Sequence, residues 1–537
     1  MEFKKTSYRF TIGLILLVYI CVQIYCINQL SPNYDEGSFA AYGTTVLKLQ
    51  REKDIVAFES KLPITALNMI PRAIEQVIRP GLTKTWPESQ SDIIHGRYIS
   101  LLFAVMLGLL IYFWTSKLYN SRTALFVLIT YLLCPNFLAH GIFVSSDIFA
   151  CFFMTAALCC LWFFFESSQN KYFLLMSIAT GLAEISKFSM VHLLLLIPSL
   201  FIVGLLRKHN LQEAKNLRGR HIIGYLAIFF AINWLIVCSG HLFYQVFTPI
   251  KEYNFRSNAF KSAQAFFNSV LPRFPVPLPS SYIQSMDAVM YFDYLGGGVQ
   301  GSLNGAPYLL GESSIKGFWY YYIVVAFYKL PLSLLVFWVT SFAVSLSKSS
   351  RKLLFRDDIF LLVPIFYYLI YMSFFYSTQV GIRHLLIIFP LLFIFSGKAI
   401  SRMFISNQKW VAFLLIGYQA ISVLAYFPHF LPYTNEFILD KKFAYKKIAD
   451  TNICYGEGKQ FLETYLLKHP DVVYMPDTLQ SGKVILEVNE MLNLDIATIH
   501  KYDWARSLRP VDHIHSQYLV FNVTMGELDS IQKHREL

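Results

Sequence analysis

Long apolar stretches alternate with short polar segments along most of this 537-residue chain. Each stretch has roughly the 20 residues that an α-helix needs to cross a bilayer. The pattern predicts about eleven membrane-spanning helices, and so an all-α polytopic membrane protein. The expected helices cover residues 8–28, 97–116, 122–143, 147–166, 172–187, 188–207, 221–240, 318–346, 357–376, 384–401 and 410–428.

The distribution of charge sets the expected orientation. Charged residues make up only 15% of the chain, yet its formal net charge is +12. The basic residues lie in short segments between the apolar stretches, so the positive-inside rule explains them and nucleic-acid binding does not. The N-terminus and these loops are expected in the cytoplasm, and everything after Pro428 outside. The residues concerned are Lys4, Lys5, Arg9, Lys117 and Arg122, and those of the loops 207–220, 348–356 and 398–409.

Two long loops, 29–95 and 241–316, are predicted on the outer side. In the first, apolar residues at near-helical spacing over 64–78 indicate a helix lying in the membrane interface. The stretch 36–49 is expected to form another helix, with Asn33 or Asp35 near its N-cap. The second loop is rich in proline and glycine, and it is expected to form an irregular cover over the outer face.

Residues 429–537 change in composition and predict a small extracytoplasmic α/β domain after a transmembrane domain of residues 1–428. Runs of β-branched and aromatic residues at 483–488 and 517–523 predict strands, and 456–468 predicts a helix. About 100 residues is an ordinary size for such a domain.

The eight cysteines give no indication of a metal site or of disulfide bonds. Their spacing resembles neither a zinc site nor a disulfide framework. The first apolar stretch also lacks a small-residue cleavage site, so it is expected to be a retained membrane span.

Three acids stand at the predicted outer mouth of the helices. Asp35 and Glu36 follow the first span, and Asp147 begins the fourth. Carboxylates are costly near a bilayer and often mark function there. Asp35 or Glu36 can act as a base or simply begin a helix. Asp147 can N-cap its helix, or orient an acceptor or a metal beside Asp35.

Basic residues also occur where the predicted outer side should have few. Arg97 opens the second span, Lys187 lies between the fifth and sixth, and Arg383 with His384 opens the tenth. Such exceptions to the positive-inside rule indicate an anionic ligand, since arginine and lysine both bind phosphate oxygens. Snorkelling to lipid headgroups is the alternative.

In their order and spacing, several short motifs resemble those of the protein O-mannosyltransferase and aminoarabinose-transferase superfamily, membrane glycosyltransferases of the GT-C type. The motifs are Tyr34-Asp35-Glu36-Gly37, the segment 97–103 led by Arg97, 135–141 followed by Ser146-Asp147, Gly181-Leu182-Ala183 with Ser186-Lys187-Phe188-Ser189, Tyr308 to Glu312 with 317–321 and Lys329-Leu330-Pro331, and Gly381-Ile382-Arg383-His384. In the tail, Asp450 to Glu457 departs from the family pattern, having lost a tryptophan and a glutamine.

The resemblance implies an inverting transfer of a sugar from a polyprenyl phosphate to a hydroxyl or phosphate of a protein or envelope glycolipid. Asp35 would be the base, Glu36 its support, and Asp147 would position the acceptor or the base. Arg97, Lys187, Arg383 and His384 would bind the lipid phosphate. No metal or cofactor is required, although a divalent cation is compatible. The site would face outward from a bacterial inner membrane, or from the ER membrane in a eukaryote.

Two other classes compete with this interpretation. A transporter or lipid-linked-sugar flippase would show inverted repeats, broken helices and polar residues near the midplane, whereas these charges gather at one edge. A non-catalytic glycosylation subunit would have a decayed site, whereas Asp35, Asp147 and Arg383 are present. The sequence does not identify the sugar or the acceptor.

Overall fold

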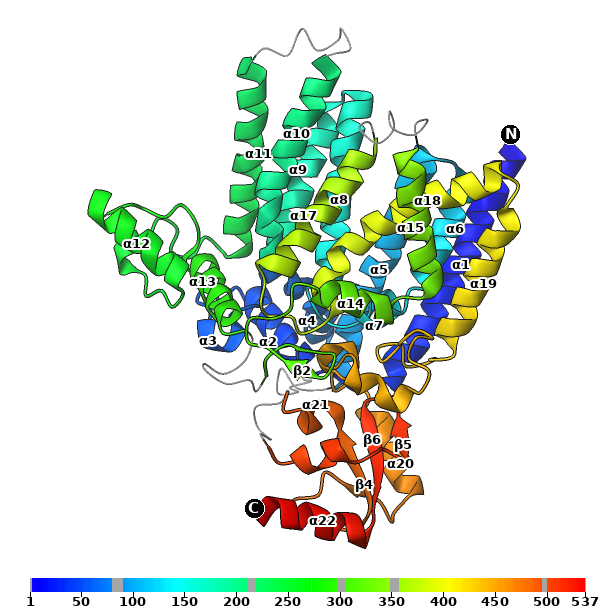
Figure 1. Ribbon diagram of the computed structural model, residues 1–537. Coiled ribbons are helices and arrows are strands. Elements are labelled where there is room, and N and C mark those ends of the chain that lie inside the picture. Colours follow the sequence, from blue (N-terminus) through cyan, green and yellow to red (C-terminus); the bar gives the residue numbers. More distant parts are fainter. Residues whose placement is uncertain are drawn as a thin grey trace.

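The computed structural model describes residues 2–79, 90–209, 219–271, 273–296, 305–347, 357–494 and 500–536. It is a bundle of long helices with a small mixed domain at one end (Figure 1). Of the predicted cytoplasmic loops, residues 210–218 of the loop 207–220 and the whole loop 348–356 lie outside the described residues.

Every segment predicted to span the membrane contains a helix. The bundle helices are α1 (Glu2–Gln29), α5 (Gln90–Leu118), α6 (Ser121–Leu132), α8 (Asp147–Ser167), α9 (Asn170–Glu184), α10 (Leu193–His209), α11 (Gly219–Gly240), α14 (Tyr321–Lys329), α15 (Leu332–Leu346), α17 (Ile359–Phe374), α18 (Phe389–Ile405) and α19 (Lys409–Leu424). Within the described residues, six helical segments are long and apolar enough to cross a membrane, and four more apolar helices are shorter. The polytopic all-α architecture is therefore confirmed.

Two predicted spans are wrong as single helices. The helix expected over 122–143 ends at Leu132, and α7 (Pro135–His140) begins after a turn. The helix expected over 318–346 divides into α14 and α15 at Leu330-Pro331. In both cases proline supplies no backbone N–H and restricts the residue before it, so a helix ends there and another begins.

Burial separates central from peripheral helices. Most of α8 and the segment Ile382–Ile405 is buried, whereas α1 and α11 leave most of their apolar surface exposed. Exposed apolar surface of this length is what lipid tails cover in a membrane protein. The side chains of α8 and α18 form the centre of a continuous apolar core.

The remaining short elements lie mostly at the end of the bundle that carries the small domain. These are α2 (Glu36–Leu47), α3 (Ile55–Phe58), η1 (Pro63–Met69), α4 (Ile70–Ile78), η2 (Phe188–His192), η4 (Ile250–Glu252), α12 (Asn258–Val270), α13 (Ser280–Tyr294), β1 (Tyr308–Leu309), β2 (Glu312–Ser313) and η6 (Ile382–Ile388). The helix expected over 36–49 is α2. Of the interfacial helix expected over 64–78, only α4 exposes its apolar side chains Ile74, Val77 and Ile78, because η1 is largely buried.

The C-terminal residues form a four-stranded sheet in the order β3-β4-β6-β5, with β3 parallel to β4 and the other pairs antiparallel. Both predicted strands and the predicted helix are present, as β4, β6 and α20. The elements are η7 (Lys441–Lys446), η8 (Asp450–Asn452), α20 (Lys459–Lys468), β3 (Val473–Tyr474), β4 (Gly482–Glu487), α21 (Val488–Met491), η10 (Asp503–Ser507), β5 (Asp512–Ile514), β6 (Tyr518–Val523) and α22 (Met525–Glu536).

The N-terminus of α1 and the sheet lie at opposite ends of the bundle (Figure 1). This arrangement agrees with the predicted placement of the N-terminus and the tail on different sides of the membrane. Which side is cytoplasmic stays a prediction from the loop charges.

Candidate active site

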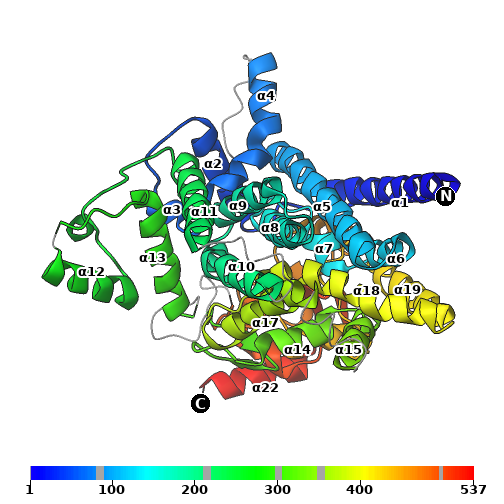
Figure 2. The same ribbon diagram turned by 90° about the horizontal axis from the view of Figure 1, so that it is seen from above.

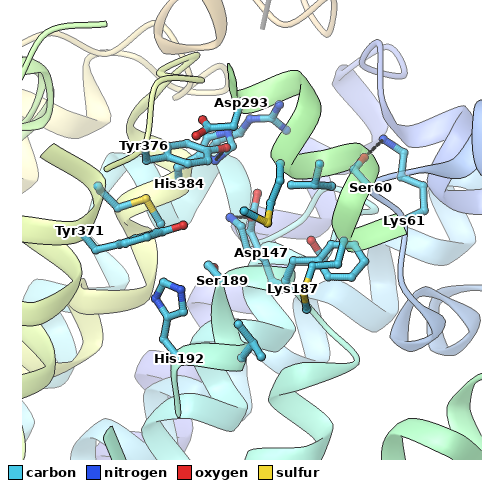
Figure 3. Close-up of a pocket in the computed structure, with 18 of the residues that line it drawn as sticks. Ser60, Lys61, Asp147, Lys187, Ser189, His192, Asp293, Tyr371, Tyr376 and His384 are labelled. Carbon is cyan, nitrogen blue, oxygen red and sulfur yellow. Dashed lines mark hydrogen bonds and ion pairs between the residues drawn. The ribbon is translucent and has the colours of Figure 1, made fainter. Parts of the chain in front are cut away.

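A cavity of about 440 Å³ lies where the bundle meets the short elements at the end that carries the sheet. Its volume is within the usual size range of ligand pockets. Five of the seven residues singled out from the sequence line it: Asp35, Asp147, Lys187, Arg383 and His384. Figure 3 shows polar side chains from several elements around it. The other lining residues are Phe39, Ser60, Lys61, Ser146, Phe188, Ser189, Val191, His192, Met286, Val289, Met290, Asp293, Tyr371, Met372, Phe375 and Tyr376.

Asp35 reaches the cavity from the residue before α2. Its side chain does not cap that helix; instead, Asn33 Oδ1 accepts from the backbone N–H groups of Asp35 and Glu36, at 3.0 Å each. The sequence had predicted either Asn33 or Asp35 near the N-cap of this helix, and the side chain that caps it is Asn33. The Asp35 carboxylate is thereby left to interact with other groups and is 32% exposed.

Three groups surround the Asp35 carboxylate. Its Oδ2 lies 3.1 Å from Arg383 and accepts a hydrogen bond from the Tyr455 hydroxyl at 2.5 Å, and its Oδ1 lies 3.8 Å from Lys61 Nζ. Burial alone would raise the pKa of Asp35, but the charges of Arg383 and Lys61 and the Tyr455 hydrogen bond outweigh it and hold the pKa below its usual range. Asp35 is therefore ionised. Its Oδ2 is bound by Arg383 and Tyr455, whereas Oδ1 has only the more distant Lys61 beside it.

Asp147 and Lys187 form a second ion pair, 2.5 Å apart. Asp147 is the first residue of α8, where a negative charge is favoured by the helix dipole. Lys187 follows α9, directly before η2. The pair therefore joins two helix ends at the cavity wall.

Arg383 depends on a glycine beside it. Gly381 has φ +150°, and a Cβ there would meet Thr451 Oγ1 at 2.1 Å. Asn452 Oδ1 then accepts from the N–H of Ile382 at 2.9 Å. This close approach to the tail carries Arg383 to Asp35 and Tyr455, and His384 to within 3.1 Å of the Tyr376 hydroxyl.

Glu36 and Arg97 lie outside the cavity lining and bind each other. Arg97 donates to both Glu36 oxygens, at 2.8 and 2.6 Å, and both side chains are 0% exposed. Arg97 also donates to the carbonyls of Ile27, Leu30 and Ser31, and Glu36 accepts from the N–H groups of Asn33 and Val144.

The roles expected for these two residues do not fit this geometry. The Arg97 guanidinium is enclosed and its donors are engaged, so it has no access to a phosphate in the cavity. Glu36 points to Arg97 and makes no described contact with the Asp35 carboxylate. The pair instead fastens the end of α1 and the start of α2 to α5.

Sequence reasoning missed Lys61, Asp293, Tyr376 and Tyr455. Lys61 carried the same signal as Lys187, a basic residue on the predicted outer side, but it lies in a long loop where the charge rule is weak. Tyr455 lies within the tail segment that departs from the family pattern. Asp293, on α13, accepts from the N–H groups of Ser377 and Thr378, and burial raises its pKa.

One cluster outside the cavity could offer metal ligands. Single ligand atoms of Glu75, Asp92 and His95 lie within 4.8 Å of one another. Arg72 lies 3.3 Å from both carboxylates, and its charge opposes a cation there. In the cavity, Asp35 and Asp147 are likewise paired with cations.

Comparison with known families agrees with the motifs. Residues 90–237, which include Arg97, Asp147 and Lys187, match the family described as dolichyl-phosphate-mannose-protein mannosyltransferase. This part of the chain is therefore related to the GT-C type glycosyltransferases, and the predicted resemblance is confirmed. No curated protein sequence matched the chain.

Several solved structures also match the chain, at TM-scores below 0.5. ArnT from Cupriavidus metallidurans, bound to undecaprenyl phosphate, has a TM-score of 0.47 at 13% identity, covering 78% of this chain and 65% of that one. The Archaeoglobus fulgidus oligosaccharyltransferase in its apo form has a TM-score of 0.48 at 13% identity, covering 86% and 60%. The archaeal oligosaccharyltransferase AglB from Archaeoglobus fulgidus, in complex with an inhibitory peptide and a dolichol-phosphate, has a TM-score of 0.48 at 12% identity, covering 87% of this chain and 60% of that one. This chain thus spans less than two thirds of the length of these structures.

Proposed function

We propose that this protein transfers a sugar from a polyprenyl phosphate to a hydroxyl or phosphate of a protein or envelope glycolipid, at the cavity and with inversion. The observation that carries the proposal is the cavity itself, which is lined by three carboxylates, three cations and several apolar side chains. It would open to the outer face of a bacterial inner membrane, or to the lumen if the source is eukaryotic. No metal is required in this scheme.

The lining of the cavity suits an amphiphilic anion. Lys61, Lys187 and Arg383 supply positive charge to the lining of the cavity. The apolar part of the lining comes from Met286, Val289 and Met290 of α13, Met372 of α17 and Phe375 directly after it. A lipid phosphate would place its phosphate among the cations and its chain against these apolar side chains. Flexible methionines adapt well to such a chain.

The reaction follows from the position of Asp35. When the acceptor is a hydroxyl, its oxygen attacks C1 of the sugar and the hydroxyl proton passes to Asp35 Oδ1. An ionised phosphate acceptor would attack C1 without giving up a proton. The C1–O bond to the phosphate breaks, and its electron pair remains on the phosphate oxygen. Arg383, Lys187 and Lys61 stabilise the added charge on the leaving polyprenyl phosphate. One displacement at C1 gives inversion.

Phosphate binding is tested at Arg383. A hydrogen bond between charged groups contributes about 1.5–3 kcal/mol, so Arg383→Ala should weaken binding of undecaprenyl or dolichyl phosphate about 10-fold or more. Arg383→Lys should recover only part, because the forked contact is lost. Binding is measured by titrating the lipid into purified protein in nanodiscs.

The control for this titration is Arg79→Ala, which removes an exposed arginine that does not line the cavity. Its affinity should equal that of the wild type. Unchanged lipid affinity in Arg383→Ala would mean that Arg383 pairs with Asp35 but does not bind the phosphate.

Tyr455 should position Asp35. Its hydroxyl binds the same oxygen that Arg383 contacts, which would leave Oδ1 directed at the acceptor. Tyr455→Phe should lower turnover about 10-fold, the value of one hydrogen bond to a charged group, while donor affinity changes little. The transfer rate and the lipid affinity are measured separately.

Tyr34→Phe is the matched control, since the Tyr34 hydroxyl donates to Glu487 in the same contact between bundle and tail but not to Asp35. It should retain wild-type turnover. When Asp35 is already replaced by Asn, adding Tyr455→Phe should not lower turnover further. If Tyr455→Phe and Tyr34→Phe lost the same share of turnover, Tyr455 would only hold the tail against the bundle and would not position Asp35.

A further inference from the structure

An irregular cover over the outer face was predicted for the whole loop 241–316, and its proline-rich first part, between α11 and α13, projects sideways instead. Gly297 and Gly298 lie outside the described residues. Residues 241–271 and 273–279 form an arm that carries α12 sideways from the bundle, as both views show (Figures 1 and 2). The arm begins at the end of α11 nearest the cavity.

The arm is internally braced. Its strand-like ends pair through Phe247 N to Val276 O, at 2.9 Å, and Ile250 N to Phe274 O, at 2.9 Å. The Gln264 side-chain amide donates from α12 to the carbonyls of Ile250 and Tyr253, at 2.8 Å each. The ring of Phe267 stacks on Phe274 at 4.7 Å. These contacts fix one face of α12 against its own loop.

The arm is also anchored to the two helices that flank it in the sequence, α11 and α13. Asp287 of α13 accepts from the backbone N–H groups of Arg256 and Ser257. The indole of Trp234, on α11, donates to the Pro277 carbonyl at 2.5 Å. The position of α12 is therefore set by the bundle.

A second face of α12 is apolar and exposed. At about 100° per residue, Ala259, Ala263, Phe266 and Val270 form one stripe, and all four are exposed. Phe266 is 63% exposed and Val270 60%. Lys261 and Asn268 lie on the opposite, polar side of the helix.

The exposed apolar surface is continuous along the chain with that of α11. Ile223, Ile228, Phe230 and Leu235 leave a lipid-type surface along α11, and Phe243 and Phe247 extend exposed apolar side chains into the arm. The arm also carries four basic residues, Lys251, Arg256, Lys261 and Arg273, against one acid, Glu252. An amphipathic helix with basic residues beside aromatic ones is typical of a membrane surface.

We infer that the arm lies on the membrane surface, with the stripe of α12 among the lipids and its basic side chains at the phospholipid phosphates. The bilayer that surrounds α11 is the occupant of this face. Because the arm leads into α13, whose Met286 and Met290 line the cavity, it would hold one cavity wall at the level of the lipid headgroups.

Photocrosslinking tests this placement without any assay of activity. Full-length protein is prepared with a photoreactive benzoyl-phenylalanine at position 266, reconstituted in phospholipid nanodiscs and irradiated. A matched protein carries the same group at position 268, an exposed site about 160° around the same helix. Mass spectrometry then measures the share of protein bearing a phospholipid adduct.

Lipid adducts should form at position 266 about fivefold more than at position 268, since only the former enters the acyl region. Both sites are exposed, so neither change should disturb the fold, which retention of monodisperse protein checks. Equal lipid adducts at the two positions, or crosslinks from 266 mainly to protein, would overturn the inference. A second copy of this chain or an acceptor protein would then cover the stripe.

Discussion

Asp35→Asn should abolish most transfer while leaving the protein folded and able to bind its donor. The amide keeps the shape of the side chain but cannot take the proton of the acceptor, and removal of a general base typically costs about 10²–10⁴ in rate. The residue is partly exposed beside the cavity, so its loss should not disturb the core. Transfer is measured against expression level and lipid binding.

The charge of Asp35 also predicts how Asp35→Asn should change the affinity for lipid phosphate. Its carboxylate pairs with Arg383 and Lys61, and so competes with a phosphate for both cations. Lipid phosphate affinity in Asp35→Asn should therefore equal or exceed that of the wild type. Asp54→Asn is the control, because Asp54 caps α3 in the same loop and does not line the cavity. Full transfer by Asp35→Asn would remove Asp35 from the chemistry.

Arg97→Ala should strongly destabilise the protein. Removing one partner of a buried ion pair leaves an uncompensated charge and costs about 3–5 kcal/mol. Here the carboxylate left behind would be Glu36, fully buried in the same pair. The folded yield and the thermal midpoint in detergent should both fall, and lipid binding should fail only because less protein is folded.

Replacing both members separates this structural role from a role in phosphate binding. The double variant Arg97→Met with Glu36→Gln removes both charges, and it should recover much of the stability because neither charge is left unpaired. The single carbonyl oxygen of Gln can still accept from one of the two N–H groups, that of Asn33 or that of Val144, which donate to different oxygens of Glu36. A stable Arg97→Ala that folds normally and loses lipid affinity would instead return Arg97 to the phosphate site.

The sequence predicted the helices well because apolar stretches of bilayer length are rare outside membrane spans. It failed at Leu133 and Leu330, where proline interrupts a stretch that remains apolar throughout. The outer segments were harder. The apolar periodicity of 64–78 was real, but half of it faces protein and half is exposed, and periodicity alone does not distinguish those environments.

For the site, charge at the wrong side of the membrane was the useful signal. It selected Lys187, Arg383 and His384, which line one cavity, and the cost of carboxylates near a bilayer selected Asp35 and Asp147, which line the same cavity. The first signal also selected Arg97, because a buried ion pair and a ligand contact look alike until the partner is known. Tyr455 could not be found, since 420 residues separate it from Asp35 and a single sequence holds no record of that contact.

The central claim is that the cavity transfers sugar with Asp35 as its base. The most direct measurement is mass spectrometry of envelope proteins and glycolipids from cells that lack this protein and then express either the wild type or Asp35→Asn. One sugar modification should be missing without the protein, return with the wild type, and stay missing with Asp35→Asn at equal expression. An unchanged set of modifications, or full return with Asp35→Asn, would contradict this account.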